Sequence, residues 1–114
     1  MTNAVYRHVA RLADIPAGKT LCVVVDGREI LLCHTADGVF AMDNLCSHAA
    51  ARLCEGRLKG HRIICPLHGA AFDIRDGSAL SRPASVAIGT YPVKLEGEDI
   101  LLAWESGAAE LARG

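Results

Sequence analysis

The stretch NLCSHAAARLCEGRLKGHRIICPLHG, residues 44–69, decides how this chain of 114 residues is interpreted. It contains three of the five cysteines and three of the five histidines. Cys46 and His48 form a Cys-x-His pair, and Cys65 and His68 form a Cys-x-x-His pair. In a reducing compartment, grouped Cys and His indicate a metal site more often than disulfides. The stretch therefore predicts a metal centre with these four residues as ligands.

The spacing of the four residues distinguishes two kinds of centre. Two Cys and two His can close a tetrahedral zinc site, but zinc fingers pair Cys with Cys and His with His. Here each loop supplies one of each, and 16 residues separate His48 from Cys65. Such mixed pairs suit a binuclear iron–sulfur cluster in which one iron has two thiolates and the other two imidazoles. A structural zinc module remains the less favoured alternative.

The pattern Cys-x-His…Cys-Pro-Leu-His-Gly resembles the signature of Rieske [2Fe–2S] proteins. The longer string from CSHAAARLCEG to YPVKLEGEDI is similar to Rieske-type ferredoxins of bacterial ring-hydroxylating dioxygenase systems. The likeness extends coarsely from about residue 4 to Trp104 and is most specific over residues 44–73. It implies one [2Fe–2S] cluster bound by two Cys and two His. It also implies that Pro83 belongs to a third loop that covers the cluster.

The ligand set and its neighbours predict a low reduction potential within the Rieske range. Two ferric ions, two sulfides and two thiolates sum to zero charge with neutral His, so a Rieske cluster accepts an electron more easily than a Cys₄ cluster. By resemblance, high-potential relatives add a disulfide between the two loops and a Ser near the second His. The matching positions here are Ala51, Leu67 and Ala70. Fewer hydrogen bonds to sulfur lower the potential, so we expect a midpoint of about −150 mV.

The resemblance implies a soluble one-electron carrier rather than an enzyme. Its partners would be an NAD(P)H-dependent flavoprotein reductase and a terminal Rieske non-haem iron oxygenase in aromatic hydrocarbon catabolism. The sequence itself argues against the oxygenase, because a mononuclear iron site needs a 2-His-1-carboxylate triad and only three other histidines remain. The alternative is a small Rieske subunit of another redox enzyme, such as NAD(P)H nitrite reductase.

Composition and charge exclude several partners. The formal net charge is −1, from 12 basic and 13 acidic residues, and aromatic residues make up only 4%, which disfavours nucleic acid. No apolar run reaches the ~18–20 residues needed to span a bilayer. Arg7, His8 and Arg11 interrupt what would be the apolar region of a signal peptide. These features predict a cytoplasmic protein, and we expect a monomer.

Short β-rich runs separated by turn signals predict an all-β fold. Asp26-Gly27 and Asp37-Gly38 each lie between apolar, branched runs, which is a strong hairpin signal. Similar signals at Asp76-Gly77 and Gly97-Glu98-Asp99 predict further turns. The expected architecture is a single domain, residues 1–114: a Rieske-type antiparallel β-sandwich with a small inserted cluster-binding subdomain at about 44–72. The tail 105–114 is expected to be flexible.

The remaining Cys and His carry simpler interpretations. Cys22 and Cys33 lie in apolar runs and are expected to behave as buried small hydrophobes. His8, His34 and His61 have no partner at metal spacing, so they are expected to be surface or strand residues. Cys54, within the first ligand-bearing loop, is interpreted as a bystander, with oxidation or alternative ligation as the other option. The pairs Asp43/Asn44 and Asp73/Asp76, which would be candidates for acid–base work, are interpreted as turn residues at strand ends.

Overall fold

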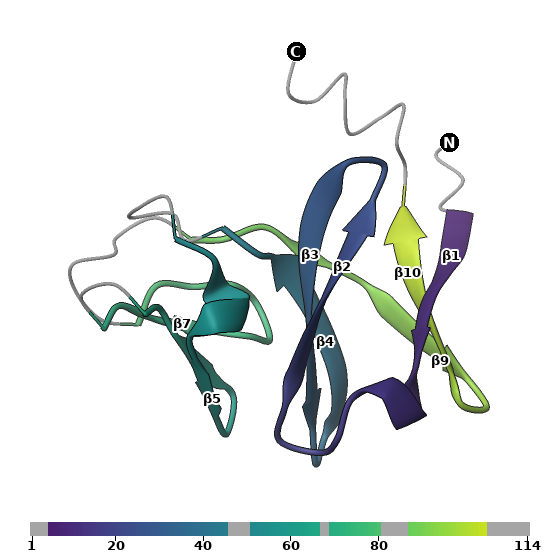
Figure 1. Cartoon of the computed structure of the whole chain (residues 1–114), viewed down its shortest axis with the longest axis horizontal. Helices are drawn as coiled ribbons and strands as arrows, with labels where there is room; N and C mark the ends of the chain where they lie inside the picture. Colours follow the sequence, from purple (N-terminus) through teal and green to yellow (C-terminus); the bar gives the residue numbers. More distant parts are fainter. Residues whose placement is uncertain (1–4, 46–50, 67–68, 81–86, 105–114) are drawn as a thin grey trace.

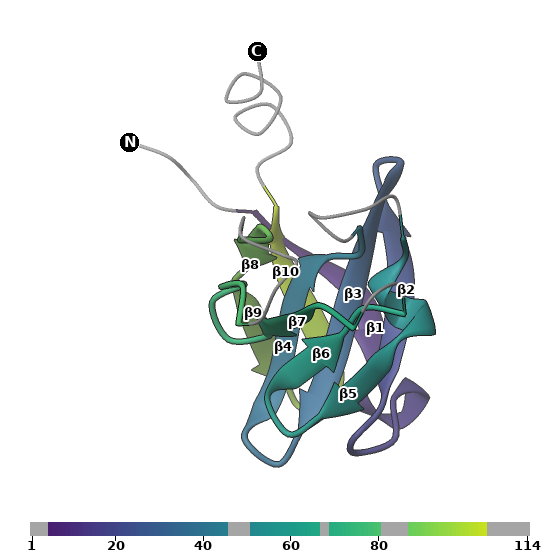
Figure 2. The same ribbon diagram turned by 90° about the vertical axis from the view of Figure 1, so that its left-hand side faces the viewer.

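The structure of the chain, a computed structural model, describes residues 5–45, 51–66, 69–80 and 87–104. Three antiparallel sheets make up the described part (Figures 1 and 2). The first has the order β1-β10-β9, the second β2-β3-β4-β8 and the third β5-β6-β7. The strands are β1 Val5–Arg11, β2 Thr20–Val25, β3 Arg28–Thr35, β4 Gly38–Asp43, β5 Arg57–Lys59, β6 Arg62–Ile64, β7 Ala71–Asp73, β8 Thr90–Tyr91, β9 Val93–Glu96 and β10 Asp99–Trp104. Two short 3₁₀ helices, η1 Leu12–Asp14 and η2 Leu53–Glu55, complete it.

The predicted hairpins form where the sequence indicates them. β2 and β3 pair from Thr20–Cys33 to Val25–Arg28, with Asp26 and Gly27 as the connecting pair. Both residues have positive φ, 51° and 81°, which is the conformation of a type I′ turn and the reason for the Asp-Gly preference. The β3–β4 and β9–β10 hairpins are formed as well. The expectation of an all-β antiparallel fold is confirmed.

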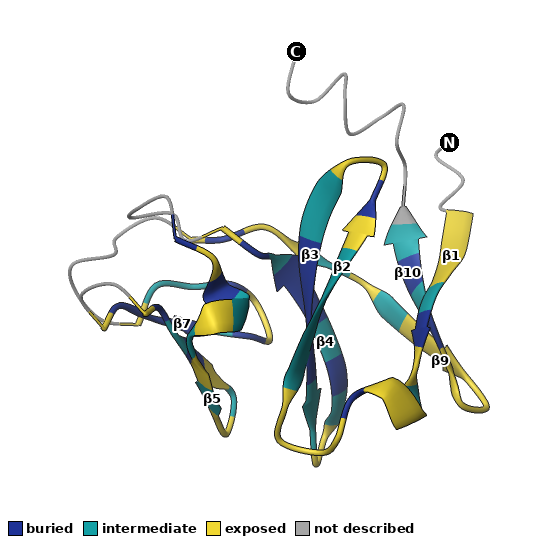
Figure 3. Ribbon diagram, viewed as in Figure 1, coloured by how far each residue is buried: buried dark blue, intermediate teal, exposed yellow. Residues whose placement is uncertain are grey.

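The second sheet is the middle layer of the molecule, and β3 shows why. Ile30 and Leu32 pack into the core shared with the first sheet, whereas Leu31 and Cys33 pack into the core shared with the third sheet. All four side chains are 0% exposed. Successive side chains of a strand point to opposite faces, so a strand buried on both faces has an uninterrupted apolar sequence. The dark central strands in Figure 3 correspond to this double burial.

The first sheet closes the side of the molecule away from the third sheet. β10 supplies Ile100 and Leu102 to the core, and β1 supplies Ala10. β1 pairs with β10 along its length, with an irregularity between His8 and Ala10. β1 was not predicted from the sequence, because its partner strand lies more than 85 residues away in the chain.

The third sheet covers the other face of the middle layer. Ile63 of β6 and Phe72 of β7 are fully buried against Leu31 and Met42 of the middle sheet. In Figure 2 these short strands lie in front of β3 and β4. Two predicted features, the tail 105–114 and Pro83, lie outside the described residues. Within the described part, no helix is long and apolar enough to cross a membrane.

Candidate metal centre

The two ends of the first predicted ligand-bearing loop lie next to each other. Cys46 and His48 lie outside the described residues, but the stem of their loop is described. Leu45 and Arg52 form an antiparallel bridge across it. The Leu53 N–H donates to the carbonyl oxygen of Asn44 at 2.6 Å. The two ends of the loop are therefore held side by side by backbone hydrogen bonding.

Asn44 fastens this stem to the rest of the molecule. Its side chain is 0% exposed, and Oδ1 accepts the Cys54 backbone N–H at 2.9 Å. Nδ2 donates to Glu29 Oε1 at 3.0 Å and to Cys54 Sγ at 3.4 Å. Since a backbone N–H can only donate, the contact with Cys54 N identifies which side-chain atom is the oxygen. The prediction of Asn44 as a simple turn residue understates its role, because every polar atom of its buried amide has a partner.

Glu29 connects the stem to the middle sheet. Its Oε2 accepts a hydrogen bond from Arg52 at 3.0 Å while Oε1 accepts the bond from Asn44. Its backbone carbonyl also accepts the Asn44 N–H at 3.1 Å. A single residue of β3 thus holds both sides of the loop stem. Nothing in the sequence indicated this, since Glu29 has no motif and lies 15 residues before Asn44.

The second ligand-bearing loop joins β6 to β7. Cys65 directly follows β6, and its N–H donates to the Ala70 carbonyl at 2.7 Å, which closes the loop. Gly69 has φ +69°, a left-handed conformation that glycine adopts without steric cost. His68 and Leu67 lie outside the described residues. The Cys65 side chain is buried, with 1% exposed, whereas Pro66 is exposed.

The stems of both loops pack into one hydrophobic cluster. Ala51 and Leu53 from the first stem belong to it together with Cys65 and Ala70 from the second. The two loops therefore start from the same patch of core, although they are separated in sequence. Ala51 and Ala70 carry only methyl groups, so neither offers a thiol or a hydroxyl. The assignment of Cys46, His48, Cys65 and His68 as ligands stays a prediction.

The surroundings of Cys65 fit an iron–sulfur cluster. A thiolate buried among apolar side chains is unfavourable unless a cation compensates its charge, and the iron of a bound cluster would do so. Backbone hydrogen bonding fixes this cysteine at the base of the loop that also carries His68. Among the residues that the structure describes, no group of three or more His, Cys, Asp or Glu could hold a metal ion. The described residues therefore offer no competing metal site.

A third segment folds against the second loop. Leu80 N–H donates to the Ala71 carbonyl at 2.8 Å, and Phe72 forms a bridge with Ala79. Gly77 lies so close to Ile88 that an added Cβ would lie 1.9 Å from its carbonyl oxygen. The glycine of the Asp76-Gly77 turn is thus required by close packing as well as by its φ of +78°.

The acidic residues near these loops have structural partners. Arg75 donates two side-chain hydrogen bonds to Asp73, at 3.0 and 2.8 Å, and these bonds lower the pKa of Asp73 to about 2. Tyr91 Oη donates to Asp43 Oδ1 at 2.6 Å. Burial, followed by this hydrogen bond, raises the pKa of Tyr91 to about 12. These contacts agree with the expectation that the acidic residues serve turns and strand ends rather than acid–base catalysis.

The other histidines contact protein atoms within the described part. His34 Nδ1 lies 2.6 Å from the Ile15 carbonyl oxygen, and His8 Nε2 lies 3.1 Å from Asp99. His61 Nε2 lies 2.6 Å from Asp37 Oδ2, so it joins the β5–β6 turn to the β3–β4 turn. The expectation of surface or strand histidines agrees with these positions.

The unassigned cysteines differ from one another. Cys33 is fully buried, as expected, and burial raises its pKa to about 12. Cys22 is only partly buried, so its interpretation as a core residue is only partly right. Cys54 is also partly buried and accepts the hydrogen bond from Asn44 described above.

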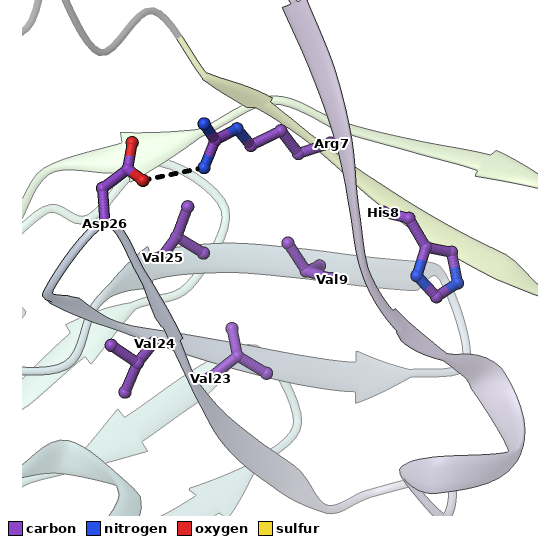
Figure 4. A pocket seen from close by; sticks show the side chains of 7 residues that line it. All are labelled: Arg7, His8, Val9, Val23, Val24, Val25 and Asp26. Carbon is purple, nitrogen blue, oxygen red and sulfur yellow. Dashed lines mark hydrogen bonds and ion pairs between the residues drawn. The ribbon is translucent and has the colours of Figure 1, made fainter.

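A surface hollow of about 200 Å³ lies between β1 and β2, away from these loops. Val23, Val24 and Val25 of β2 and residues 7–9 of β1 line it. Figure 4 shows the Arg7 guanidinium directed at Asp26, 3.0 Å away, across one end of the hollow. Cys65, the predicted ligand that the structure describes, does not line it.

Comparison with known proteins identifies similar domains. The family model described as "Rieske [2Fe-2S] domain" matches residues 6–92. The ferredoxin component of the naphthalene 1,2-dioxygenase/salicylate 5-hydroxylase systems of Ralstonia sp. is 46% identical over 96 residues, which cover 84% of this chain and 92% of the relative.

Solved structures agree with this likeness. The ferredoxin of carbazole 1,9a-dioxygenase from Nocardioides aromaticivorans IC177 superposes with a TM-score of 0.84 at 35% identity, covering 88% of this chain and 98% of that one. The complex of reduced oxygenase and oxidised ferredoxin in carbazole 1,9a-dioxygenase matches with a TM-score of 0.82 at 29% identity, over 89% of this chain and 94% of the other. A nitrite reductase small subunit from Mycobacterium tuberculosis has a TM-score of 0.80 but only 23% identity, over 92% and 99% of the two chains. That last likeness shows a shared fold alone.

Proposed function

Because this chain belongs to the Rieske [2Fe–2S] domain family, we propose that it carries single electrons through a cluster bound by Cys46, His48, Cys65 and His68. The two thiolates would bind one iron, and the two imidazoles would bind the other. The domain would be residues 1–114, with a cluster-binding subdomain at about 44–72. The described stems support the proposal, since Cys65 is buried and both loops start from one core cluster.

The electrons would pass from an NAD(P)H-dependent flavoprotein reductase to a terminal Rieske non-haem iron oxygenase that acts on an aromatic ring. The observation that carries this step is the match to ferredoxin components over nearly their whole length, 92% and 98% of the two relatives reported above. Proteins with those names are electron-transfer components of dioxygenase systems, and this chain is accordingly an electron-transfer protein rather than an enzyme. We also propose that it acts as a monomer in the cytoplasm.

The chain's own residues would set the conditions of electron transfer. When bound, a [2Fe–2S] cluster supplies one-electron redox chemistry at a potential tuned by its ligands and its hydrogen bonds. The buried Cys65 and the methyl groups of Ala51 and Ala70 exclude water from the base of the loops. Ala70 offers no hydroxyl, so its side chain gives no hydrogen bond that would stabilise a reduced centre. This arrangement favours a potential near the lower end of the Rieske range, about −150 mV.

An assay with purified partners tests the proposal. The chain is mixed with NADH, the reductase and the oxygenase of a naphthalene dioxygenase system, and formation of the dihydrodiol product is followed with and without it. We expect two iron and two acid-labile sulfides per chain, a reduced-state EPR signal with mean g below 2, and product only when the chain is present. One zinc and no sulfide would establish the zinc module instead. A loaded cluster that supports no oxygenase and co-purifies in a large nitrite-reducing complex would establish the alternative subunit role.

A further inference from the structure

Cys22 lies on the face of β2 that is turned toward the cluster-binding side. Side chains of a strand alternate between faces, and Leu21, Val23 and Val25 pack into the core shared with the first sheet. Cys22 therefore points to the opposite face, together with its cross-strand partner Leu31. Leu31 belongs to the core that contains the loop stems.

Cys54 approaches the same place from η2. It packs against the edge of the hydrophobic core that contains Leu31, and η2 contacts β2. Two contacts with Asn44 hold Cys54 in position: its N–H donates to Asn44 Oδ1 at 2.9 Å, and its Sγ accepts from Nδ2 at 3.4 Å. Cys22 and Cys54 lie close enough for the charge and side-chain hydrogen bonding of Cys54 to contribute to raising the pKa of Cys22.

The pair has no role in the proposed electron carrier, because the predicted thiolate ligands are Cys46 and Cys65. Cys22 and Cys54 are both partly exposed residues, whereas Cys33 is fully buried. Two adjacent, partly exposed thiols outside a metal site form a dithiol that can be oxidised to a disulfide. In reducing compartments such disulfides are typically transient and respond to oxidants.

We propose that Cys22 and Cys54 form an intramolecular disulfide when the protein meets hydrogen peroxide. The Cys54 sulfur attacks one peroxide oxygen, so that an S–O bond forms and the O–O bond breaks, and the departing hydroxide takes the Cys54 proton and leaves as water. The Cys22 sulfur then attacks the Cys54 sulfur, the S–S bond forms and the S–O bond breaks. The second hydroxide takes the Cys22 proton and leaves as water. Two thiols lose two electrons, and one peroxide is reduced to two waters.

The order of the two thiols follows from their surroundings. Burial, followed by the charges of Cys54 and Glu29, raises the pKa of Cys22 to about 11. Cys22 therefore remains protonated at neutral pH and reacts poorly with peroxide by itself. It acts as the resolving thiol, and Cys54 reacts first. The product would link β2 of the middle sheet to the stem of the first ligand-bearing loop.

Peptide mapping of the cluster-loaded protein tests this proposal. The protein is treated with equimolar hydrogen peroxide, remaining thiols are blocked with N-ethylmaleimide, and the chain is digested with trypsin. Cleavage after Lys19, Arg28, Arg52 and Arg57 places Cys22 in peptide 20–28 and Cys54 in peptide 53–57, apart from every predicted ligand and from Cys33. We expect these two peptides to be joined, with a mass two hydrogens below their sum, and to separate on reduction with dithiothreitol.

Three variants, together with the visible absorbance of the iron–sulfur cluster, distinguish the possible outcomes. In Cys22→Ser, we expect Cys54 to accumulate as a sulfenic acid that dimedone captures. Cys54→Ser should give no cross-link. The control Cys33→Ala should retain the wild-type cross-link. The visible absorbance of the cluster is recorded throughout. Blocked thiols on both peptides, or Cys54 joined to Cys46 or Cys65, would overturn the proposal. Because the readout is the mass of peptides, a failure to deliver electrons to an oxygenase would leave it unchanged.

Discussion

The buried amide of Asn44 accepts the backbone N–H of Cys54 at 2.9 Å and so closes the stem of the first ligand-bearing loop. The other half of the amide donates to Glu29 of the middle sheet at 3.0 Å. A residue with no ligand role thus determines where the segment with Cys46 and His48 leaves the core.

Replacing Asn44 by Ala should destabilise the cluster-loaded protein by about 2 kcal/mol, because a partly buried backbone N–H and a partly buried carboxylate oxygen lose their partner. Urea unfolding followed by circular dichroism and by the visible absorbance of the cluster measures the change. The matched control is Arg52→Ala, which removes only the exposed contact with Glu29 at 3.0 Å and should cost less than about 1 kcal/mol. Equal losses in the two variants would contradict the role of Asn44.

Gly56 is expected to tolerate no side chain. A Cβ at this position would lie 1.9 Å from the Ile64 carbonyl oxygen, one residue before Cys65. Gly56→Ala must therefore displace β6, and we expect several kcal/mol of destabilisation together with lower iron content per chain. Gly60→Ala is the control: its φ is +61° and nothing lies within 4 Å of the added atom, so only backbone strain of about 1 kcal/mol is expected. The prediction fails if Gly56→Ala retains full iron content and the stability of the control.

Tyr91 should make stability fall at alkaline pH. Its pKa is raised to about 12, first by burial and then by its bond to Asp43, whereas the pKa in the unfolded chain is about 10. The folded protein thus holds a proton that the unfolded chain loses, so this contribution is complete below pH 10 and lost as the pH rises toward 12. Absorbance at 295 nm should show one of the two tyrosines titrating near pH 12. Tyr91→Phe should cost about 1 kcal/mol at pH 8 and reduce the loss of stability between pH 8 and 11; an unchanged loss would contradict the assignment.

Local signals in the sequence predicted more of the fold than of the site. Asp26-Gly27 predicted its hairpin because two positive φ angles are a property of those two residues. β1 was not predicted, because its pairing with β10 depends on the far end of the chain. Strands β5 and β6 of the third sheet were also missed, since strands of three residues such as Arg57–Lys59 are too short to show an alternating pattern.

In the candidate site, too, local features could be predicted from the sequence and long-range contacts could not. The ligands could be predicted from the spacing of Cys and His, because they lie within two short segments. The contacts of Cys54 could not be predicted, since Asn44 and Cys22 reach it through the fold and not through a motif. Sequence reasoning therefore identified which cofactor to expect, whereas the structure was needed to find what holds the first loop in place.

Ala70 provides the sharpest test of the predicted low potential. It is fully buried, directly before β7, and its carbonyl accepts the Cys65 N–H at 2.7 Å. Ala70→Ser adds a hydroxyl at this position, and a hydrogen bond from it to a cluster sulfur would stabilise the reduced state by about 1–1.5 kcal/mol. For a one-electron couple 59 mV corresponds to a tenfold change, or 1.4 kcal/mol, so the midpoint should rise by roughly 40–60 mV. A spectroelectrochemical titration measures both proteins, with Ala79→Ser as the control that should leave the midpoint unchanged. A wild-type midpoint above about +100 mV, in the upper part of the Rieske range, or an unchanged midpoint in Ala70→Ser, would show that the hydrogen bonds of this loop do not set the potential.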